Sequence, residues 1–299
     1  RTEDGRESVM EAVFYVNGAL VPREEAKVSL FDHGLLYGDG VFEGMRMIDR
    51  RIFRLEDHMR RLASGLAAVG LTLPGGVEAA REAALTAARA YRGRDAYLRL
   101  VVTRGEGPLG VDPFSCETPT LFCIADGIAL FPAEKRARGL DLITASVRKP
   151  GPDQLDPRVK SLNYMNSVLA KREARLRGAD EAIVLNQAGR VAEASVANVF
   201  VVREGALLTP PANDGALEGI TRKTVLELAK ELGIPAYERS LTRVDLLSAE
   251  ECFLTGTGAR LVSARSLDGA RIGGEERPIA AAILRAFEDA APGLGVPVD

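Results

Sequence analysis

The 299-residue sequence is poor in the residue types that usually mark metal sites and disulfide frameworks. Its three cysteines, Cys116, Cys123 and Cys252, form no CxxC pair, so we expect small buried side chains in a reducing compartment. Its two histidines, His33 and His58, are too few and too isolated to predict a metal site. We therefore expect a cytoplasmic protein that binds no metal.

Long apolar runs and a strong net charge are also missing. No apolar run approaches the roughly 20 residues that a membrane helix needs. The N-terminal stretch RTEDGRESVM lacks the apolar region of a secretory signal. A net charge of -3 gives no general reason to bind nucleic acid or an anionic membrane. The hydrophobic content of 46% and the charged content of 27% are ordinary for a globular protein.

The predicted elements favour an α+β chain with two domains, which its length allows. We expect a small α+β domain over 1–125 with a largely antiparallel sheet, a linker over 126–137, and a larger domain over 138–299. The first part predicts a hairpin at 13–21, a strand turn near 49–50, helices over 55–70 and 77–92, and strands over 96–105 and 118–127.

The second part predicts strands, turns and three helical segments. A run after Lys160 has helical spacing, because Leu162, Met165, Leu169 and Leu176 fall on one face. The other expected elements are a strand over 140–149, a meander over 180–211, a helix over 215–233, strands over 234–242, 251–258 and 260–269, and a closing helix over 277–291.

Lysine is scarce, with seven lysines against thirty-two arginines, so the position of Lys160 is informative. Lys160 could be a solubilising surface charge or an amine that points into a cleft. A neutral lysine amine reacts with aldehydes, and Tyr164, four residues on, could place a phenol in the same cleft. The ordinary alternative is a surface lysine and a core tyrosine.

Three further stretches have a functional and an ordinary interpretation. Glu193, in GRVAEASVANVF, lies either on a solvent face or buried with a cation. Gly219 and Thr221, in EGITRKT, form either an anion site at a helix N-terminus or a simple cap. Thr257, in LTGTGA, lies either at a phosphate edge or in a tight turn. Together with Lys160, these stretches supply an amine, an acid, a phenol and two phosphate-ready turns, which are the groups that pyridoxal phosphate needs.

Five stretches, in one order, resemble a known family. They are FDHGLLYGDGVFEGMR, VKSLNYMNSVLAKREA, GRVAEASVANVFVV, TPPANDGALEGITRKTVLELAKELGIP and FLTGTGA. From about Phe14 to its end, the chain resembles the class IV aminotransferases, which are fold-type IV pyridoxal-phosphate enzymes. It is most similar to the branched-chain amino acid aminotransferases. The resemblance implies a small α+β domain, a larger pseudo-barrel domain, a site at the domain interface, and a homodimer or higher homo-oligomer.

The resemblance also implies the residues that bind the cofactor, pyridoxal 5'-phosphate. Lys160 would form the internal aldimine and move the substrate α-proton. Glu193 would keep the pyridine nitrogen protonated, and Tyr164 would hydrogen-bond the ring oxygen. The other implied cofactor residues are Arg61 at the phosphate, Leu217 against the ring, and Gly219, Ile220, Thr221, Gly256 and Thr257 in the phosphate cup.

The implied substrate residues come from three parts of the chain. Val111 matches a loop residue that reaches the site of a neighbouring subunit. The set comprises Tyr37, Phe42, Gly44, Arg46, Tyr97, Arg99, Val111, Gly258, Ala259 and Arg260.

The implied activity is transfer of the amino group of L-leucine, L-isoleucine or L-valine to 2-oxoglutarate, with small-molecule substrates only. One departure affects the substrate. The chain has GARLVSA after Thr257, where branched-chain enzymes commonly have Ala-Ala-Glu, and this places Arg260 and Ser263 near the carboxylate turn. The alternatives within the fold are a D-amino acid or (R)-amine transaminase and an aminodeoxychorismate lyase. A non-catalytic cofactor-binding protein is disfavoured because Lys160, Tyr164 and Glu193 are all present.

Overall fold

The structure is a computed structural model that describes residues 11–127 and 131–299, and these residues divide into two units. Unit 1 comprises 11–127 together with Pro292–Asp299, and unit 2 comprises 131–291. We expected 292–299 in the larger domain, which was wrong, because strand β16 (Gly295–Pro297) pairs with β4 (Arg51–Phe53) of unit 1. The expected linker, 126–137, also differs, since helix α4 (Ala133–Arg138) belongs to unit 2. Residues 1–10, with the stretch in which we sought a signal, and 128–130 lie outside the described residues.

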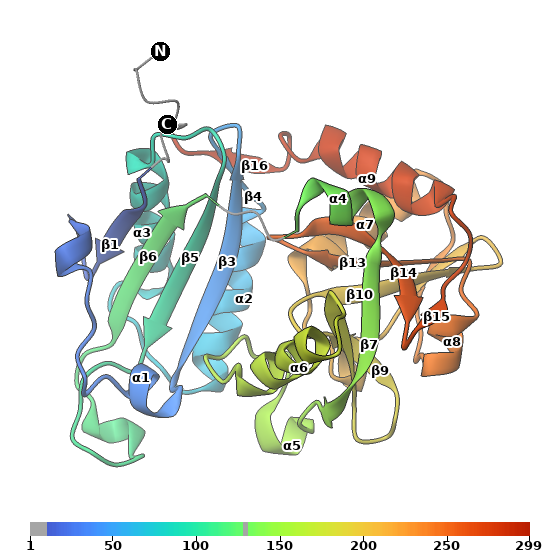
Figure 1. The fold of residues 1–299 in the computed structure, drawn as a ribbon. Helices are drawn as coiled ribbons and strands as arrows, with labels where there is room; N and C mark the ends of the chain where they lie inside the picture. The colour runs from blue at the N-terminus through green and yellow to red at the C-terminus, as the bar shows by residue number, and fades with distance from the viewer. Residues whose placement is uncertain (1–10, 128–130) are drawn as a thin grey trace, which may run out of the picture. The chain divides into compact units, whose positions relative to one another are not determined.

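Unit 1 is a seven-stranded antiparallel sheet in the order β16-β4-β3-β5-β6-β1-β2, as the sequence predicted for this part of the chain. Its strands β3, β5 and β6 lie side by side in Figure 1, and helices α2 and α3 pack against the sheet. Its other elements are β1 (Val13–Val16), β2 (Ala19–Val21), α1 (His33–Tyr37), β3 (Gly40–Ile48), α2 (Leu55–Ala68), α3 (Gly76–Ala90), β5 (Ala96–Thr103) and β6 (Thr120–Asp126).

Two tight turns in unit 1 follow directly from local sequence. Asn17 and Gly18 have φ angles of 44° and 101° and join β1 to β2. Asp49 and Arg50 have φ angles of 49° and 61° and join β3 to β4. Two residues of positive φ suit the twist of a two-residue hairpin. Both predicted turns are confirmed.

Unit 2 is built on a nine-stranded mixed sheet in the order β12-β11-β10-β13-β14-β7-β8-β9, with β15 paired to β14. Strands β9 and β10, far apart in that order, also contact each other, so the sheet curls back on itself. This confirms the predicted pseudo-barrel. Its elements are β7 (Leu140–Arg148), α5 (Pro152–Leu155), α6 (Met165–Leu176), β8 (Glu181–Leu185), β9 (Val191–Ala194), β10 (Asn198–Arg203), β11 (Ala206–Thr209), α7 (Ile220–Glu231), β12 (Ala236–Glu238), α8 (Arg243–Leu247), β13 (Glu251–Gly256), β14 (Arg260–Leu267), β15 (Ala270–Arg271) and α9 (Pro278–Ala290).

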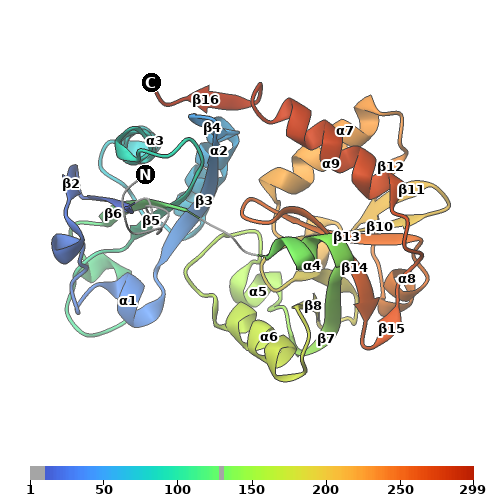
Figure 2. The ribbon, with the colours of Figure 1, turned by 45° about the horizontal axis from the view of Figure 1, so that its top comes forward.

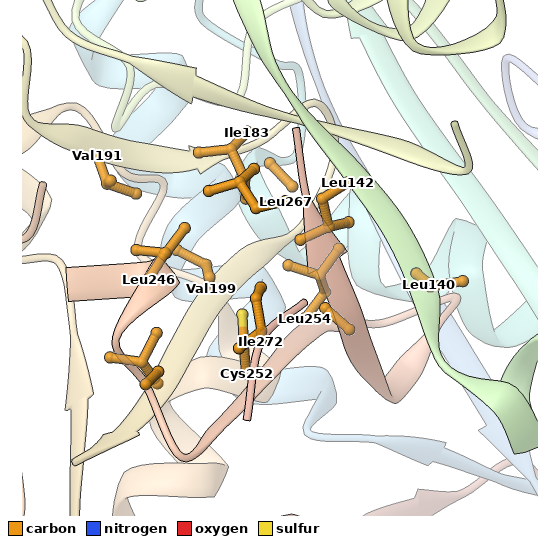
Figure 3. Packing of buried hydrophobic residues seen from close by; sticks show 14 of the residues in the cluster. Leu140, Leu142, Ile183, Val191, Val199, Leu246, Cys252, Leu254, Leu267 and Ile272 are labelled. Atoms are coloured by element: carbon orange, nitrogen blue, oxygen red, sulfur yellow. The ribbon is translucent and has the colours of Figure 1, made fainter. Parts of the chain in front are cut away.

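Strand β10 shows how both faces of this sheet are buried. Val199 and Val201 point into a cluster enclosed by the curled sheet, part of which Figure 3 shows. Phe200 and Val202 point the other way, into a second cluster beneath α7 and α9, which lie side by side in both ribbon views (Figures 1 and 2). Alternation along a strand sends successive side chains to opposite faces, so a continuous apolar run fits a strand that is covered twice.

Helix α6 buries a different face from the one we expected. Its buried residues are Ser167, Ala170 and Ala174, and the two alanines pack against β7 and β8. Met165 and Leu176, which we placed on the apolar face, are 67% and 70% exposed. Leu169 is also exposed and Leu162 half-buried, so that prediction was wrong. Small side chains let the helix approach the sheet closely, which a count of large apolar residues does not detect.

Candidate active site

Lys160 lies in the loop between α5 and α6, and its amine meets the Tyr164 phenol. Lys160 Nζ donates a hydrogen bond to Tyr164 Oη at 3.0 Å and lies 5.5 Å from the centre of the ring. Tyr164 occupies the N-cap position of α6, so the first turn of this helix fixes its direction. Both side chains line a hollow of unit 2 together with Glu193 and Leu217. The structure therefore brings together the predicted amine, phenol, acid and ring-packing residue.

Glu193 lies on β9 and is buried, with three hydrogen-bond donors around its carboxylate. Lys149 Nζ lies 2.5 Å from Oε1, while Asn198 Nδ2 and the Leu217 backbone N–H donate to Oε2 at 3.2 and 3.0 Å. The side chains of Lys149 and Glu193 are 12% and 8% exposed. Of the two interpretations left open for Glu193, the structure selects the buried acid with a cationic partner.

The N-terminus of α7 provides an anion-ready turn. Gly219 is its N-cap residue, no side chain caps the helix, and Thr221 is buried in the first turn. The first amides of a helix have no acceptor within the helix, so they can bind an anion. A Cβ on Gly219 would lie 2.0 Å from Asn198 Oδ1. Only glycine fits there while Asn198 keeps its place.

Asn198 connects the acid to both predicted phosphate turns. Its amide donates to Glu193 and, at 2.8 Å, to the Leu217 carbonyl just before α7. It also lies opposite Thr255 in the β10–β13 pairing, next to the turn that contains Thr257. The turn from Thr257 to Ala259 closes where Gly256 pairs with Arg260, which has a φ angle of 59°.

Arg260 and Ser263, in the stretch that departs from the family pattern, lie on β14. Arg260 Nη1 is 3.7 Å from Glu288 Oε1 on α9, so its charge has a carboxylate neighbour. Ser263 is the pairing partner of Phe253, three positions further along the strand. Arg136 donates to the carbonyl of Ala259 at 2.8 Å. Burial and then the nearby Arg260 charge lower the pKa of Arg136 below its usual value.

The predicted substrate residues on β3 and β5 lie on one face of this strand pair. The pairing sets Gly44 opposite Arg99 and Arg46 opposite Tyr97, and opposed residues in an antiparallel pair share a face. The Arg99 guanidinium lies 4.5 Å from the Phe42 ring centre and donates to Tyr97 Oη at 3.0 Å. A Cβ on Gly44 would lie 2.0 Å from Tyr97 Oη, so glycine makes room for the phenol.

The opposite face of β3 contains a buried acid that the sequence did not single out. Glu43 is 0% exposed and accepts bidentate hydrogen bonds from Arg61 at 2.8 and 2.7 Å, while His58 Nδ1 lies 2.6 Å from Oε2. Burial alone would raise the pKa of Glu43. The charges of Arg61 and His58 and their hydrogen bonds outweigh that effect and hold the pKa far below its usual value. Arg61, the predicted phosphate arginine, is thus fixed within unit 1 by Glu43.

Tyr37 and the loop of Val111 are brought together in unit 1. The Gly110 backbone N–H donates to Tyr37 Oη at 2.8 Å, and His33 packs edge-on against the Tyr37 ring at 4.9 Å. Val111 itself is 80% exposed.

Lys149, Asn198 and Glu43 are the main residues that sequence reasoning missed. Two signals were present, since Lys149 is one of only seven lysines and Asn198 lies within the family-like stretch GRVAEASVANVFVV. Within 11–127 and 131–299, no three His, Cys, Asp or Glu side chains are grouped to hold a metal ion. The described helices include none that is long and apolar enough to cross a bilayer.

Known proteins resemble this chain over nearly its whole length. Residues 40–267 match the family described as amino-transferase class IV. A putative branched-chain-amino-acid aminotransferase of Methanocaldococcus jannaschii is 48% identical over 255 residues, which are 85% of this chain and 88% of the relative. Among solved structures, the Escherichia coli branched-chain amino acid aminotransferase aligns with a TM-score of 0.92 and 32% identity, over 96% of this chain and 99% of that one.

A third relative bears on the cofactor. The branched-chain amino acid aminotransferase of T.th., in complex with N-(5'-phosphopyridoxyl)-L-glutamate, aligns with a TM-score of 0.90 and 34% identity, over 97% of this chain and 100% of that chain.

Fold and matches together define a fold-type IV enzyme. The chain belongs to the class IV aminotransferase family, and its relatives are branched-chain amino acid aminotransferases. The expected family, fold type and enzymatic character are confirmed.

Proposed function

We propose that this chain is a pyridoxal-phosphate-dependent aminotransferase that moves the amino group of L-leucine, L-isoleucine or L-valine to 2-oxoglutarate. One observation carries the proposal: the amine of Lys160, the phenol of Tyr164 and the carboxylate of Glu193 line a single hollow of unit 2. The names of the relatives support the substrate class, and the phosphopyridoxyl-glutamate complex of one relative supports the cofactor and the amino acceptor.

The described groups of unit 2 fit the cofactor. Its phosphate needs hydrogen-bond donors, and the uncapped N-terminus of α7 offers backbone amides beside Gly219. The Thr255 hydroxyl, nearby on β13, is fully buried without a hydrogen-bond partner in the described part of the chain. The Glu193 carboxylate suits a ring nitrogen that carries a proton.

Within unit 2, we assign the cofactor residues as the resemblance implies. Lys160 would hold the cofactor through its amine, Glu193 the ring nitrogen and Tyr164 the ring oxygen. The remaining assignments are Leu217 against the ring and Gly219, Ile220, Thr221, Gly256 and Thr257 at the phosphate. The roles of Arg61 and of the substrate residues of unit 1 stay predictions.

The chemistry divides between the cofactor and the chain. When bound, pyridoxal phosphate supplies an aldehyde for an amine and a ring that accepts an electron pair. Lys160 takes the α-proton of the amino acid at Nζ and returns it, because a neutral amine is a competent base. Tyr164 accepts a hydrogen bond from Lys160 and keeps Nζ at one position. Glu193 supplies negative charge opposite the ring nitrogen, and its contact with Lys149 keeps the carboxylate oriented.

Arg260 lies beside the turn expected to receive the substrate carboxylate, and its carboxylate neighbour is Glu288 at 3.7 Å, a weak contact at that distance. We retain the branched-chain donors because the relatives are named as branched-chain aminotransferases.

We also propose that the chain acts as a homodimer or higher homo-oligomer. The α1 segment and the loop before β6 are held together by a hydrogen bond from Gly110 to Tyr37. They expose several large apolar side chains, and such a patch marks an interaction surface. The most exposed are Leu30 at 79%, Leu109 at 74%, Val111 at 80% and Phe114 at 94%. Light scattering after size-exclusion chromatography tests this, since a monomer at micromolar concentration would contradict it. A cytoplasmic location remains a prediction from cysteine usage alone.

A half-reaction scan tests the donor. The protein loaded with pyridoxal phosphate is mixed separately with L-leucine, L-valine, D-alanine and (R)-1-phenylethylamine, and the yellow absorption of the cofactor is followed. Loss of this band with the L-branched amino acids alone is expected. Loss with D-alanine or the (R)-amine would favour the alternative transaminases, and persistence with all four would favour a lyase.

A further inference from the structure

Unit 2 contains a second hollow, of about 740 Å³, that the proposed reaction does not use. It lies where β7 and β14 run parallel, between the end of α4, the turn after α6 and the turn after β14. None of its lining residues lines the hollow around Lys160. Its volume falls within the roughly 300–1,000 Å³ that is usual for small-molecule sites.

Arginine dominates the wall of this hollow. Five arginines line it, against the two carboxylates of Asp141 and Glu275. The five are Arg138, Arg177, Arg265, Arg271 and Arg277. Guanidinium groups present planar forks of N–H donors that match carboxylate and phosphate oxygens in pairs, so a wall of several such groups suits an anion.

Two of the arginines are already engaged by Asp141. Arg138 Nη1 lies 2.7 Å from Asp141 Oδ2, and Arg265 binds both oxygens at 2.9 and 2.8 Å. The hydrogen bonds from Arg265 are the main reason that the pKa of Asp141 lies well below its usual value. Arg138 also donates to Asp180 at 2.8 Å, so the two guanidinium groups are held by two carboxylates and form a fixed floor.

The other three arginines have weak partners or none. Arg177 lies 3.4 Å from Glu173 and 3.8 Å from Asp268, and Arg271 lies 3.5 Å from Glu275. Close pairs have N–O distances of about 2.7–2.9 Å, and exposed pairs contribute little to stability. Arg277 has no carboxylate within ion-pair distance in the described part of the chain, and it is half-buried.

Gly139 makes room for Arg277 at the edge of the hollow. It has a φ angle of 87°, and a Cβ there would lie 3.0 and 3.2 Å from the two terminal nitrogens of Arg277. The guanidinium therefore lies close against bare backbone, which keeps it beside the hollow instead of extended into solvent.

We propose that this hollow binds a small organic anion that carries two or more carboxylate or phosphate groups. Arg177, Arg271 and Arg277 supply the forks, and the exposed contacts to Glu173 and Glu275 give way to the ligand. The site is separate from the aminotransferase chemistry and does not depend on the proposed substrate.

The test measures anion binding to the enzyme loaded with pyridoxal phosphate. Isothermal titration calorimetry is run with citrate and, separately, with pyrophosphate, at an ionic strength held constant with sodium chloride. Saturable binding of at least one probe is expected. The stronger probe tells whether carboxylate or phosphate is preferred.

Substitutions then locate the binding. Replacing Arg271→Gln and Arg277→Gln together should weaken it at least about tenfold, since hydrogen bonds to charged groups are lost. Arg239→Gln, an exposed arginine of unit 2 that does not line the hollow, is the matched control and should change nothing. Arg271→Gln alone, at a 61% exposed side chain, guards against a folding defect and should weaken binding by a smaller factor.

Three results would overturn the proposal. They are no saturable binding of either probe, binding that survives the double substitution, and an equal loss in the Arg239→Gln control. The transamination rate of the double variant should stay unchanged, because none of its altered residues lines the Lys160 hollow.

Discussion

The two units each contain a buried glutamate on a strand, and the two glutamates have different surroundings. Glu43 of unit 1 is 0% exposed and is bound by both His58 and Arg61. Glu193 of unit 2 has a single cation, Lys149, and its remaining donors are an amide side chain and a backbone N–H. Glu43 points away from the face of β3 that carries Gly44, whereas Glu193 lines the Lys160 hollow.

These different surroundings indicate different roles for the two carboxylates. Glu43 lines neither of the two hollows of unit 2, and its carboxylate is engaged by Arg61 and His58. Such a buried ion pair orients its partners and stabilises one packing. A buried carboxylate on the wall of a hollow can also compensate charge on a bound group. We therefore expect changes at Glu43 to affect mainly folding, and changes at Glu193 to affect mainly the rate of the reaction.

The largest effect is expected at Lys160, in the Glu193 hollow, and it concerns the rate of transamination. Lys160→Ala should reduce transamination by more than about 10⁴-fold, because both the attachment of the cofactor and the base are lost. The free energy of unfolding should barely change. Single-turnover absorbance with L-leucine measures the rate, and urea unfolding measures stability.

Lys230→Ala is the matched control for Lys160→Ala, since Lys230 is an exposed lysine of the same unit. It should retain full activity. Substantial turnover by Lys160→Ala would contradict the role given to this amine.

Glu43→Gln should cause the largest loss of stability. It leaves Arg61 and His58 in their places without the charge that balances them, and breaking a buried pair costs about 3–5 kcal/mol. The expected result is a fall of that order in the free energy of unfolding, measured by urea denaturation. Glu56→Gln, at an exposed glutamate of α2, should have almost no effect. An equally small effect of Glu43→Gln would contradict the proposal that the Glu43 ion pair stabilises the fold.

Much of the fold could be predicted because its determinants are local. The Asn17-Gly18 turn, the apolar run of β10 and the Gly219 start of α7 each depend on neighbouring residues. The pairing of β16 was missed because this strand has only three residues, ends in a proline and shows no alternation of apolar and polar side chains. Its partner β4 is also more than 240 residues away. The buried face of α6 was missed because its packing depends on alanines.

The site was predictable in part, and for a similar reason. Lys160 and Tyr164 are four residues apart, so their contact can be expected from one loop and one helix start. Lys149 and Glu193 are 44 residues apart and meet only through the parallel pairing of β7 with β8 and the antiparallel pairing of β8 with β9. The pairing of Glu43 with Arg61 likewise requires that α2 packs on β3. Local sequence motifs indicate the candidate side chains, but the order of strands in the sheet determines which distant side chains are in contact.

Glu193→Gln should have the next largest effect, now on rate. It keeps the shape of the side chain and removes its charge, and loss of one electrostatic partner in a site costs about 10²–10³-fold. We expect kcat to fall by about 100-fold with little change in KM, measured with L-leucine and 2-oxoglutarate. A rise in KM at unchanged kcat would contradict the electrostatic role.

Lys149→Met should have a smaller effect of both kinds, because Asn198 and the Leu217 N–H still hold Glu193. We expect kcat to fall by about tenfold and the unfolding free energy by about 2 kcal/mol, the value of a hydrogen bond to a charged group. Lys149→Arg keeps the charge and should restore most of both. If Arg failed to restore either quantity while Met retained the rate, Lys149 would be a packing residue only.

The smallest effect is the pH dependence of the Glu43 contribution. Its folded pKa lies far below the ordinary value of 4.5, so the stabilisation is complete above that value and is lost as the pH falls below it. The difference in unfolding free energy between the native chain and Glu43→Gln should therefore be constant at neutral pH and shrink from about pH 4 downward. Urea unfolding in steps down to about pH 3 measures it. The charged groups that face Glu43 are Arg61 and His58, and a parallel series with His58→Gln isolates the histidine's own titration. A difference that grows on acidification would mean that Glu43 is protonated in the folded chain, and the contrast with Glu193 would then need another explanation than charge.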